Sequence, residues 1–301
     1  MKKRGTEESG PPRRLIHYTP LRYPGGKAKL AAFVKAIIEE NGLSDTHYVE
    51  AYAGGAGVAL ELLFHEYVSH VHINDICRPV YCFWKSVLDD TDALIKLVRD
   101  TRLSVASWDK QKRVLANADD FDDLQVGFAT FFLNRTNRSG ILKGGIIGGR
   151  DQTGPWKIDA RYNVEELVHR ITSIARQRRR IHLYKQDAIA FLRRKLPALP
   201  ESSFVYLDPP YYEKGNKLYL DFYTHRDHQR IADFVRWNLF PQKWIVSYDN
   251  VEAIHRLYAG FRNIVYELDY SAREARKGSE VMFFCDGLTI QAPAGAMELV
   301  A

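Results

Sequence analysis

The chain has 301 residues, of which 46% are hydrophobic and 27% charged, so it is long enough to bury a sizeable core in one large or two smaller domains. Its net charge of +6 favours a polyanionic partner, although many basic proteins bind no nucleic acid. The three cysteines have no metal-ligand spacing, and no apolar run approaches the ~20 residues of a membrane span. We therefore expect a soluble, cytoplasmic protein without a metal site.

The chain begins with a polar segment, residues 1–19, which we interpret as a flexible tail. The stretch from Tyr23 to Lys27, Tyr-Pro-Gly-Gly-Lys, then leads into a helix predicted from Ala28 to Glu40. Glycines let the backbone come close to a ligand, and a helix N-terminus favours carboxylates and phosphates. The spacing is not that of a P-loop, and a turn that merely leads into a helix explains it equally well.

A buried strand over His47–Glu50 ends in an acid and is followed by a turn that contains Gly54, Gly55 and Gly57. This order is typical of the nucleotide-binding turn in doubly wound α/β proteins. An acid before the glycines favours the ammonium of S-adenosylmethionine over a dinucleotide, whose pyrophosphate the acid would repel. The next strand ends at Asp75, roughly 20 residues beyond the glycines, where an acid commonly binds ribose hydroxyls or else caps the strand.

The alternation of strands and helices breaks off between residues 79 and 163. Apolar spacing predicts four helices there: Tyr81–Asp90, Asp92–Arg102, Val105–Asn117 and Asp122–Leu133. A polar, basic and glycine-rich stretch from Asn134 to Arg150 follows them. We predict an inserted helical domain with a DNA-reading loop, although an ordinary surface loop is the alternative. Arginine and asparagine suit base edges and lysine suits phosphates, so the candidate contacts are Asn134, Arg135, Asn137, Arg138, Lys143 and Arg150.

An apolar strand over Phe204–Leu207 runs into Asp208-Pro209-Pro210-Tyr211. The prolines cannot continue a sheet ladder, so the strand stops at the edge where ligands bind in open α/β sheets. A flat heterocycle with an exocyclic amino group fits this motif. Its ring can stack on Tyr211, while the Asp208 carboxylate and the Pro209 carbonyl accept the two amino hydrogens and make the nitrogen more nucleophilic.

The C-terminal part of the chain supplies further sheet elements and a loop over residues 213–224 that we expect to cover the site. A strand over Trp244–Asp249 has a polar end, and two late strands, Phe261–Tyr270 and Glu280–Cys285, are expected to pair as a hairpin at the sheet edge. Arg178, Arg179 and Arg180 form a basic run that either faces solvent or contacts phosphates.

In this order the motifs resemble the Dam-type (D12 class) S-adenosylmethionine-dependent DNA adenine methyltransferases, from about Leu21 to Phe284. The Asp-Pro-Pro-Tyr sequence is similar to the catalytic motif of that family, and Tyr-Pro-Gly-Gly-Lys is similar to its opening motif, where Trp is usual in place of Tyr. The resemblance implies catalytic roles for Asp208, Pro209, Pro210 and Tyr211. It implies that the cofactor contacts Tyr23, Lys27, Glu50, Tyr52, Gly54, Gly55, Gly57, Asp75, Asp187 and Asp208.

The chain departs from the family at two places. Glu50-Ala-Tyr52 stands where the family has Glu-Pro-Phe, and Thr136-Asn-Arg-Ser-Gly140 replaces its Asn-Arg and aromatic segment, so its best-known target sequence is not carried over. Asp187, which the resemblance places at the adenine of the cofactor, would look the same in sequence as a helix cap.

The resemblance implies a doubly wound methyltransferase sheet with a late β-hairpin and an inserted, mainly helical DNA-recognition domain. We expect tails at 1–19 and 291–301, a discontinuous catalytic domain at 20–80 and 164–290, and a target-recognition domain at 81–163. The expected reaction transfers a methyl group from S-adenosylmethionine to the exocyclic nitrogen of a flipped adenine in double-stranded DNA. We expect a monomer or weak dimer, with a cognate restriction endonuclease as a possible partner.

Three alternatives stay open at this point. A Rossmann dehydrogenase shares the stretch from Gly54 to Asp75 but leaves Asp-Pro-Pro-Tyr unexplained. A methyltransferase for the amino group of cytosine, or for RNA, shares the same motif chemistry. A non-catalytic DNA-binding protein on the same scaffold is disfavoured because Asp208, Tyr211 and Glu50 are intact.

Overall fold

The computed structural model describes residues 18–22, 30–213, 223–270, 276–290 and 298–299. Most of both predicted tails therefore lies outside the described residues, as do Tyr23, Lys27 and most of the predicted covering loop. No described helix is long and apolar enough to span a membrane.

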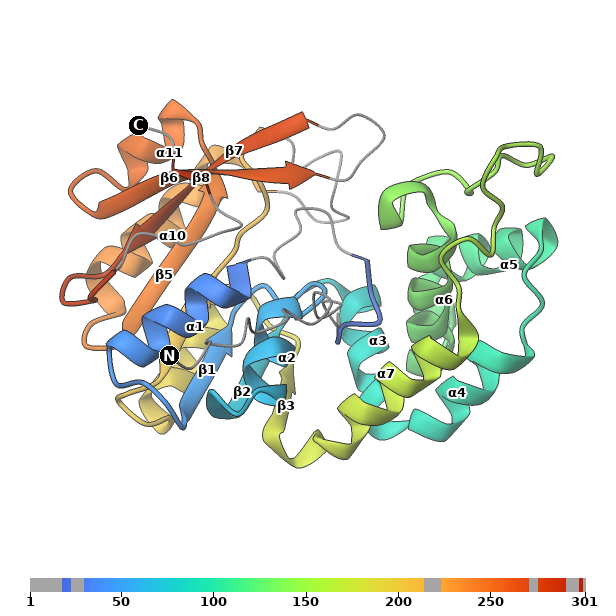
Figure 1. Cartoon of the computed structure of the whole chain (residues 1–301), viewed down its shortest axis with the longest axis horizontal. Coiled ribbons are helices and arrows are strands. Elements are labelled where there is room, and N and C mark those ends of the chain that lie inside the picture. Colours follow the sequence, from blue (N-terminus) through green and yellow to red (C-terminus); the bar gives the residue numbers. More distant parts are fainter. Residues whose placement is uncertain (1–17, 23–29, 214–222, 271–275, 291–297, 300–301) are drawn as a thin grey trace, which may run out of the picture.

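Eight strands form one sheet in the described part of the chain, in the order β3-β2-β1-β4-β5-β7-β6-β8 (Figure 1). The bounds are β1 Thr46–Glu50, β2 Val68–Asn74, β3 Ile181–Tyr184, β4 Phe204–Leu207, β5 Lys243–Asp249, β6 Arg262–Tyr270, β7 Arg276–Phe284 and β8 Glu298–Leu299. Strands β1 to β5 pair in parallel, and the later strands pair antiparallel. The doubly wound sheet and the late hairpin of β6 and β7 are confirmed.

The strand order reverses between β1 and β4. From β1 the chain moves outward to β2 and β3, and it then returns to place β4 on the other side of β1. Glu50 lies opposite Tyr206 in this parallel pair, so the carboxyl ends of β1 and β4 are neighbours. Ligands bind at such switch points in open α/β sheets.

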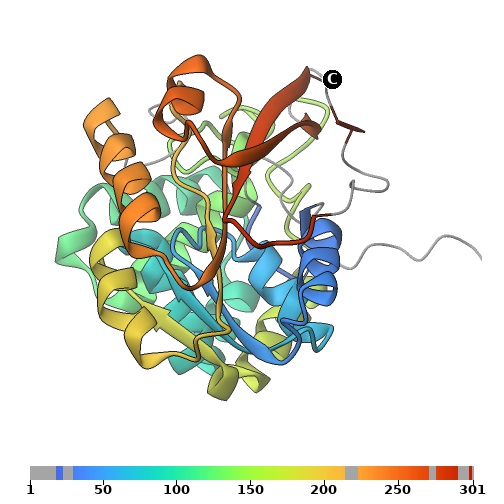
Figure 2. The ribbon, with the colours of Figure 1, turned by 90° about the vertical axis from the view of Figure 1, so that its left-hand side faces the viewer.

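Helices cover both faces of the sheet, because the parallel strands are apolar on both sides. Figure 2 shows α1 (Leu30–Glu40) and α2 (Gly57–Phe64) on one face, with α8 (Ala188–Lys195) and α10 (His225–Asn238) on the other. In α1 the buried residues Phe33, Val34, Ile37 and Ile38 repeat every three or four positions, which gives the helix one apolar stripe. A further helix, α11 (Glu252–Leu257), follows β5.

Five α-helices lie between β2 and β3 in sequence: α3 Arg78–Asp89, α4 Thr91–Asp100, α5 Val105–Ala116, α6 Asp123–Thr136 and α7 Val164–Arg176. Figure 1 shows α4 to α7 grouped beside the sheet. The first four match the predicted helices within a few residues. Helix α7, assigned in sequence to the catalytic domain, contacts α3 and α4. One continuous buried cluster joins the sheet to these helices, so the division into domains stays a prediction.

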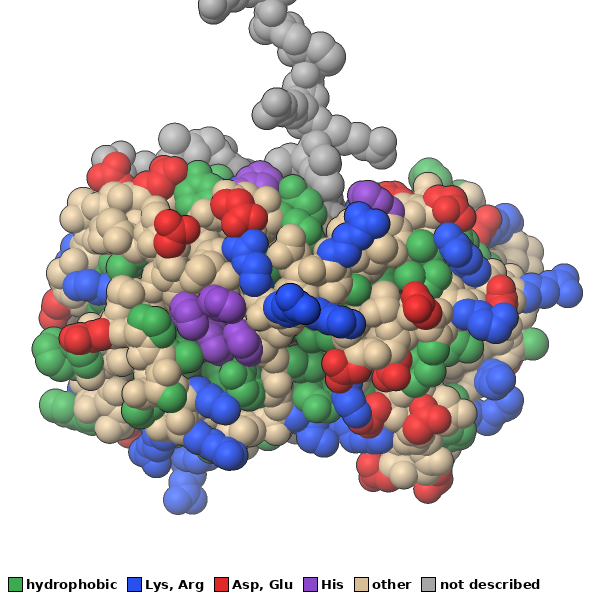
Figure 3. All heavy atoms as spheres, turned by 90° about the horizontal axis from the view of Figure 1, so that it is seen from below, with side chains coloured by type: hydrophobic (Ala, Val, Ile, Leu, Met, Phe, Trp, Pro, Cys, Tyr) green, Lys and Arg blue, Asp and Glu red, His purple; other side chains and the backbone are tan. Residues whose placement is uncertain are grey.

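Four histidines from three adjacent strands form a cluster on one sheet face, and Figure 3 shows histidine side chains gathered in one patch. Nδ1 of His47 lies 3.0 Å from Nε2 of His72, and Nε2 of His182 lies 3.2 Å from Nδ1 of His70. The rings of His72 and His182 are stacked with centroids 4.5 Å apart. Stacked rings direct their nitrogens within parallel planes rather than toward one point. No group of three or more His, Cys, Asp or Glu among the described residues is placed to hold a metal ion.

Candidate active site

The glycine-rich turn after β1 is held in an unusual backbone conformation. Gly54 and Ala56 both have φ of 46°, in the left-handed region that glycine adopts freely and that costs other residues roughly 1–2 kcal/mol. Both oxygens of Asp75 accept backbone hydrogen bonds, Oδ2 from the Gly54 amide at 2.9 Å and Oδ1 from the Cys77 amide at 2.9 Å. The indole of Trp84 donates to the Gly54 carbonyl at 2.9 Å. Two residues that follow the turn in sequence, Asp75 and Trp84, thereby hold the backbone of Gly54 in place.

Asn74, which is not among the predicted site residues, connects three loops. Its buried side-chain amide donates to the carbonyls of Ala51 and Gln186, both at 3.0 Å, and its oxygen accepts from the Gln186 amide at 3.0 Å. The carboxyl ends of β1, β2 and β3 are thereby held at one edge. The signal in sequence is the Asn74-Asp75 pair, of which the prediction names only the acid.

The predicted cofactor residues lie at this edge wherever the structure describes them. Glu50 ends β1 and is buried, and Tyr52 is half-buried in the turn. The Tyr223 hydroxyl donates to the Tyr52 hydroxyl at 3.4 Å, and burial raises the pKa of Tyr52 well above its usual range. Asp187 caps α8, since its Oδ1 accepts from the Ala190 amide at 3.1 Å. The helix cap is therefore real, while contact of Asp187 with a cofactor stays a prediction.

Asp208 follows directly on β4 and is half-buried beside the end of β1. Its Oδ1 accepts from the Ser247 hydroxyl at 2.7 Å, and Oγ of Ser247 lies 2.8 Å from the Tyr206 hydroxyl. Because the single hydrogen of Ser247 goes to the carboxylate, Tyr206 must donate to Ser247. Burial raises the pKa of Tyr206 well above its usual range, which keeps this donor protonated. The relay holds Oδ1 of the Asp208 carboxylate in place.

The residues after the prolines are anchored by strands β5 and β7. The Asp249 carboxylate accepts the amides of Tyr212 at 2.8 Å and Glu213 at 3.0 Å. The Tyr211 hydroxyl donates to Oε1 of Glu280 at 2.5 Å. Asp249 lies opposite Glu280 in the β5–β7 pair, so one sheet segment supports the loop from two strands.

Ser247, Asp249 and Glu280 therefore support the catalytic motif from strands β5 and β7. Ser247 and Asp249 are two residues apart on β5, and side chains at that spacing point to the same sheet face. The polar end of this strand is visible in the sequence, but nothing local marks Ser247 or Asp249 as functional. Glu280 was detectable only as an acid at the start of the apolar run Val281–Phe284.

Tyr211 is only 4% exposed as a whole residue in this structure. The prediction that it offers a flat face to a base therefore requires neighbouring groups to move aside. Its backbone is held by the prolines before it and by the Asp249 contacts after it, and its hydroxyl is held by Glu280.

Three of the six predicted DNA contacts are buried, and for them the prediction is wrong. Asn134 and Asn137 are 2% and 0% exposed, and Arg135 is 9% exposed. The Asn134 amide donates to the carbonyls of Arg22 and Gly140, while Asn137 accepts from the Trp108 indole at 2.6 Å. Burial lowers the pKa of Arg135. The end of α6 faces the protein interior, so these side chains cannot reach base edges.

The other three predicted contacts, Arg138, Lys143 and Arg150, are exposed. Arg150 forms a two-pronged ion pair with Asp109 at 2.8 and 2.9 Å. In the basic run, the Arg180 guanidinium binds Glu66 through two hydrogen bonds at 3.0 and 2.8 Å and also contacts two backbone carbonyls. Arg180 is therefore a structural residue.

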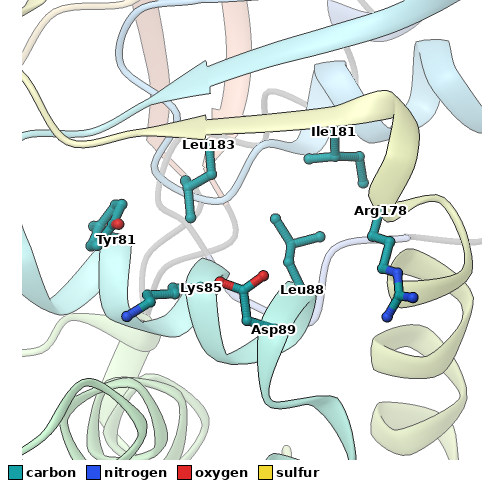
Figure 4. A pocket seen from close by; sticks show the side chains of 7 residues that line it. All are labelled: Tyr81, Lys85, Leu88, Asp89, Arg178, Ile181 and Leu183. Carbon is teal, nitrogen blue, oxygen red and sulfur yellow. The ribbon is translucent and has the colours of Figure 1, made fainter.

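A cavity of about 280 Å³ lies between α3 and the β3 region (Figure 4). It is lined by Tyr81, Lys85, Leu88, Asp89, Arg178, Ile181 and Leu183. None of the predicted catalytic or cofactor residues lines it, and we assign it no role.

An acid, a glycine-rich turn and the Asp-Pro-Pro-Tyr motif thus lie at neighbouring strand ends. A comparison of the sequence with known protein families agrees with this site. Residues 23–271 match the D12 class N6 adenine-specific DNA methyltransferases. The chain belongs to this family. It is therefore an adenine-specific DNA methyltransferase, and the family implies S-adenosylmethionine as cofactor and DNA as substrate. The dehydrogenase alternative is excluded.

Among its relatives, the type II methyltransferase M.MjaIII of Methanocaldococcus jannaschii is 24% identical over 264 residues, which cover 80% of this chain and 88% of that protein. A solved structure from Listeria monocytogenes, assigned to the class I S-adenosylmethionine-dependent methyltransferases, is 11% identical with a TM-score of 0.39, covering 94% of this chain and 65% of its own. Protein LPL1258 of Legionella pneumophila is 10% identical with a TM-score of 0.33, over 86% and 85% of the chains. These two structural likenesses are too low to bear on function.

Proposed function

We propose that this methyltransferase draws a target adenine out of duplex DNA and methylates its exocyclic nitrogen at the switch point between β1 and β4. The observation that carries the proposal is the Asp208 carboxylate, oriented by Ser247 at 2.7 Å on the strand next to Glu50. The acceptor motif and the cofactor turn thus share one edge of the sheet.

The residues at this edge fit the proposed cofactor. A buried acid, Glu50, suits the ammonium of a methionine group, and the left-handed backbone at Gly54 lets a ligand approach the turn closely. Asp75 would hold ribose hydroxyls and Asp187 the adenine amino group. S-adenosylmethionine, when bound there, supplies an electrophilic methyl group on a cationic sulfur.

The Asp-Pro-Pro-Tyr residues bind and orient the base. Removing an adenine from the duplex costs a few kcal/mol, and stacking on Tyr211 returns ~1–3 kcal/mol of this. The Asp208 carboxylate and the Pro209 carbonyl accept the two amino hydrogens and aim the nitrogen. No strong base is needed first, because the proton becomes acidic only after the nitrogen is alkylated. Positioning and preorganised acceptors therefore supply much of the acceleration.

Substitution Asp208→Ala tests this proposal. We expect the variant to lose methyl transfer at least about a hundredfold, because the carboxylate orients the reacting nitrogen. It should keep most of its S-adenosylmethionine affinity, because Asp208 is only one of the predicted cofactor contacts and the glycine turn, Glu50 and Asp75 are unchanged. Radiolabel transfer to plasmid DNA and calorimetric cofactor binding give the two readouts. The matched control is Asp286→Ala, which removes an exposed acid at the end of the hairpin. A near-normal rate in Asp208→Ala would remove this residue from the mechanism.

The base itself is tested by digesting the methylated DNA to nucleosides. Adenine methylated at N6 is the expected product, and cytosine methylated at N4 would contradict the adenine assignment. RNA offered in place of DNA should not be methylated. A cognate restriction endonuclease and a monomeric or weakly dimeric state stay predictions.

A further inference from the structure

We propose that Glu280 is a positioning residue for methyl transfer, which fixes the tilt of the Tyr211 ring against the flipped adenine. The inference rests on the proposed function, because it takes Tyr211 as the ring on which the base stacks. None of the motifs that identify the family includes Glu280, which reaches the site from the late hairpin.

Glu280 is completely buried and contacts two phenols. Its Oε1 accepts the hydroxyl of Tyr211 at 2.5 Å, and its Oε2 accepts the hydroxyl of Tyr266 at 2.9 Å. A buried carboxylate is tolerated only when its oxygens are hydrogen-bonded, and the two phenols supply such bonds. One oxygen is thus turned toward the catalytic motif and the other toward the hairpin.

The sheet leaves this carboxylate little freedom to shift. Within β7, Glu280 lies opposite Asp249 of β5 on one side and opposite Tyr266 of β6 on the other. Strands on both sides therefore hold its backbone, while Tyr266 holds its second oxygen. The hydroxyl of Tyr211 is consequently bound to a carboxylate whose position is set by the strands on either side of β7.

The ring of Tyr211 is then held at both ends. Asp249 anchors the chain just beyond it through the amides of Tyr212 and Glu213, and Glu280 anchors the hydroxyl. A stacked base follows the plane of the ring, so the tilt of the ring decides where the amino nitrogen lies relative to Asp208. Small misplacements of reacting atoms slow reactions strongly.

The charge of Glu280 adds an electronic effect to the geometric one. A phenol that donates to a carboxylate carries more electron density in its ring than a free phenol. The adenine becomes cationic as its nitrogen is alkylated, and cations are attracted to electron-rich aromatic faces. This attraction is stronger after methyl transfer begins than before, which is the condition for accelerating the step.

The test compares Glu280→Gln, Tyr211→Phe, the double variant and Tyr266→Phe. We measure kcat and KM for plasmid DNA, calorimetric affinity for S-adenosylmethionine and thermal unfolding. Tyr211→Phe removes the bond and should lower kcat roughly tenfold, because the ring is no longer held at its hydroxyl. Glu280→Gln keeps a neutral acceptor in place of a charged one, so it should weaken the same bond and lower kcat by a smaller factor. Cofactor affinity should be unchanged in both. The double variant should be no slower than Tyr211→Phe alone, since both changes act on one interaction. Tyr266→Phe removes the phenol that holds the second oxygen of Glu280 but keeps the bond between Glu280 and Tyr211, so kcat should fall less than it does in Tyr211→Phe.

Each other outcome overturns the inference. Wild-type kcat in Glu280→Gln, or multiplied losses in the double variant, would mean that Glu280 does not act through Tyr211. An equal loss of kcat in Tyr266→Phe would show a general packing role. If Glu280→Gln fails to fold by circular dichroism, Tyr211→Phe decides alone: normal folding with reduced kcat supports the inference, and wild-type kcat refutes it. Failure of the proposed function is distinguishable, because the wild-type protein itself would then methylate no adenine.

Discussion

Two regions of this protein carry the polar residues predicted to act in catalysis or DNA binding. Those at the sheet edge lie together at the candidate site, whereas those at the end of α6 are buried. At the sheet edge, Glu50, Asp75 and Asp208 stand at the carboxyl ends of neighbouring strands. At the end of α6, Asn134 and Asn137 turn inward and hold loop backbone. An acid that ends a parallel strand is placed by the topology of the sheet. A polar residue at a helix end faces solvent or the interior according to how the following loop folds.

The two regions also differ in the residues that hold them in place. At the sheet edge the catalytic motif is held by neighbouring strands: Ser247 of β5 binds Asp208, Asp249 of β5 binds the backbone after Tyr211, and Glu280 of β7 binds Tyr211. In the helical region the predicted polar side chains themselves hold the backbone of the loop after α6. Substitutions at the sheet edge should therefore slow catalysis, whereas substitutions at the end of α6 should reduce stability.

The largest expected effect on stability is at Asn137. Its amide donates to the carbonyls of Ile141 and Leu142 at 2.9 and 3.1 Å, and its oxygen accepts from Trp108. Asn137→Ala leaves these buried groups unpaired, so the free energy of unfolding should fall by ~2–4 kcal/mol in urea denaturation. Asn117→Ala is the control, because Asn117 is exposed near the end of α5. Unchanged stability with an altered target sequence would restore a base-reading role.

The histidine cluster gives the next largest effect, and it belongs to the sheet side of the comparison. Burial and the neighbouring histidines lower the pKa of His72 to about 3, and they also lower the pKa of His47 and His182. Lys195 adds positive charge nearby, and the Tyr184 hydroxyl lies 3.2 Å from His72. Protonation is therefore easier in the unfolded chain, whose histidines titrate near pH 6.5.

Stability contributed by this cluster should be complete above pH 6.5 and should fall as the pH drops toward the folded pKa values. For His72 alone we expect a loss of about 2 kcal/mol between pH 7 and pH 5. Urea denaturation at several pH values measures it. His72→Gln should flatten the dependence, whereas His169→Gln, at an exposed position, should keep it. An equally steep dependence in His72→Gln would contradict the assignment.

A smaller catalytic effect is expected at Asp249, whose carboxylate holds two amides after the catalytic motif. Asp249→Asn exchanges one acceptor for a donor and should lower kcat roughly tenfold through looser positioning. Cofactor affinity should be unchanged, because the cofactor residues lie on other strands. The companion variant Asp233→Asn alters an exposed acid on α10 and should act like the wild type. Full activity in Asp249→Asn would show that the anchored backbone is dispensable.

The smallest effect on stability is expected where the helical region is exposed. A triple substitution of Arg138, Lys143 and Arg150 to Ala should leave the free energy of unfolding nearly unchanged, because exposed ion pairs contribute little. DNA affinity should fall, and the slope of log K against log salt should decrease by up to about 1 for each lost phosphate contact. Filter binding at several salt concentrations measures both. An unchanged slope would mean that these three residues make no phosphate contacts and that DNA binds at another surface.

Much of the fold could be predicted because its signals are local. The apolar run before Asp208, the prolines that stop it and the glycines after Glu50 each act within a few residues. Their order along the chain was enough to indicate the family. The partners of these residues could not be predicted, because Ser247 and Glu280 meet the motif only through the register of β5 and β7.

The sequence by itself therefore determined the parallel sheet, the late hairpin, the family and the places of Glu50 and Asp208 at strand ends. Only the tertiary structure decided that Glu280 fixes Tyr211 and that Asn134 and Asn137 are buried. The physical reason is the range of the interactions. Strand formation and chain reversal depend on neighbours in sequence, whereas burial and cross-strand hydrogen bonds depend on packing between segments as far as 69 to 112 residues apart.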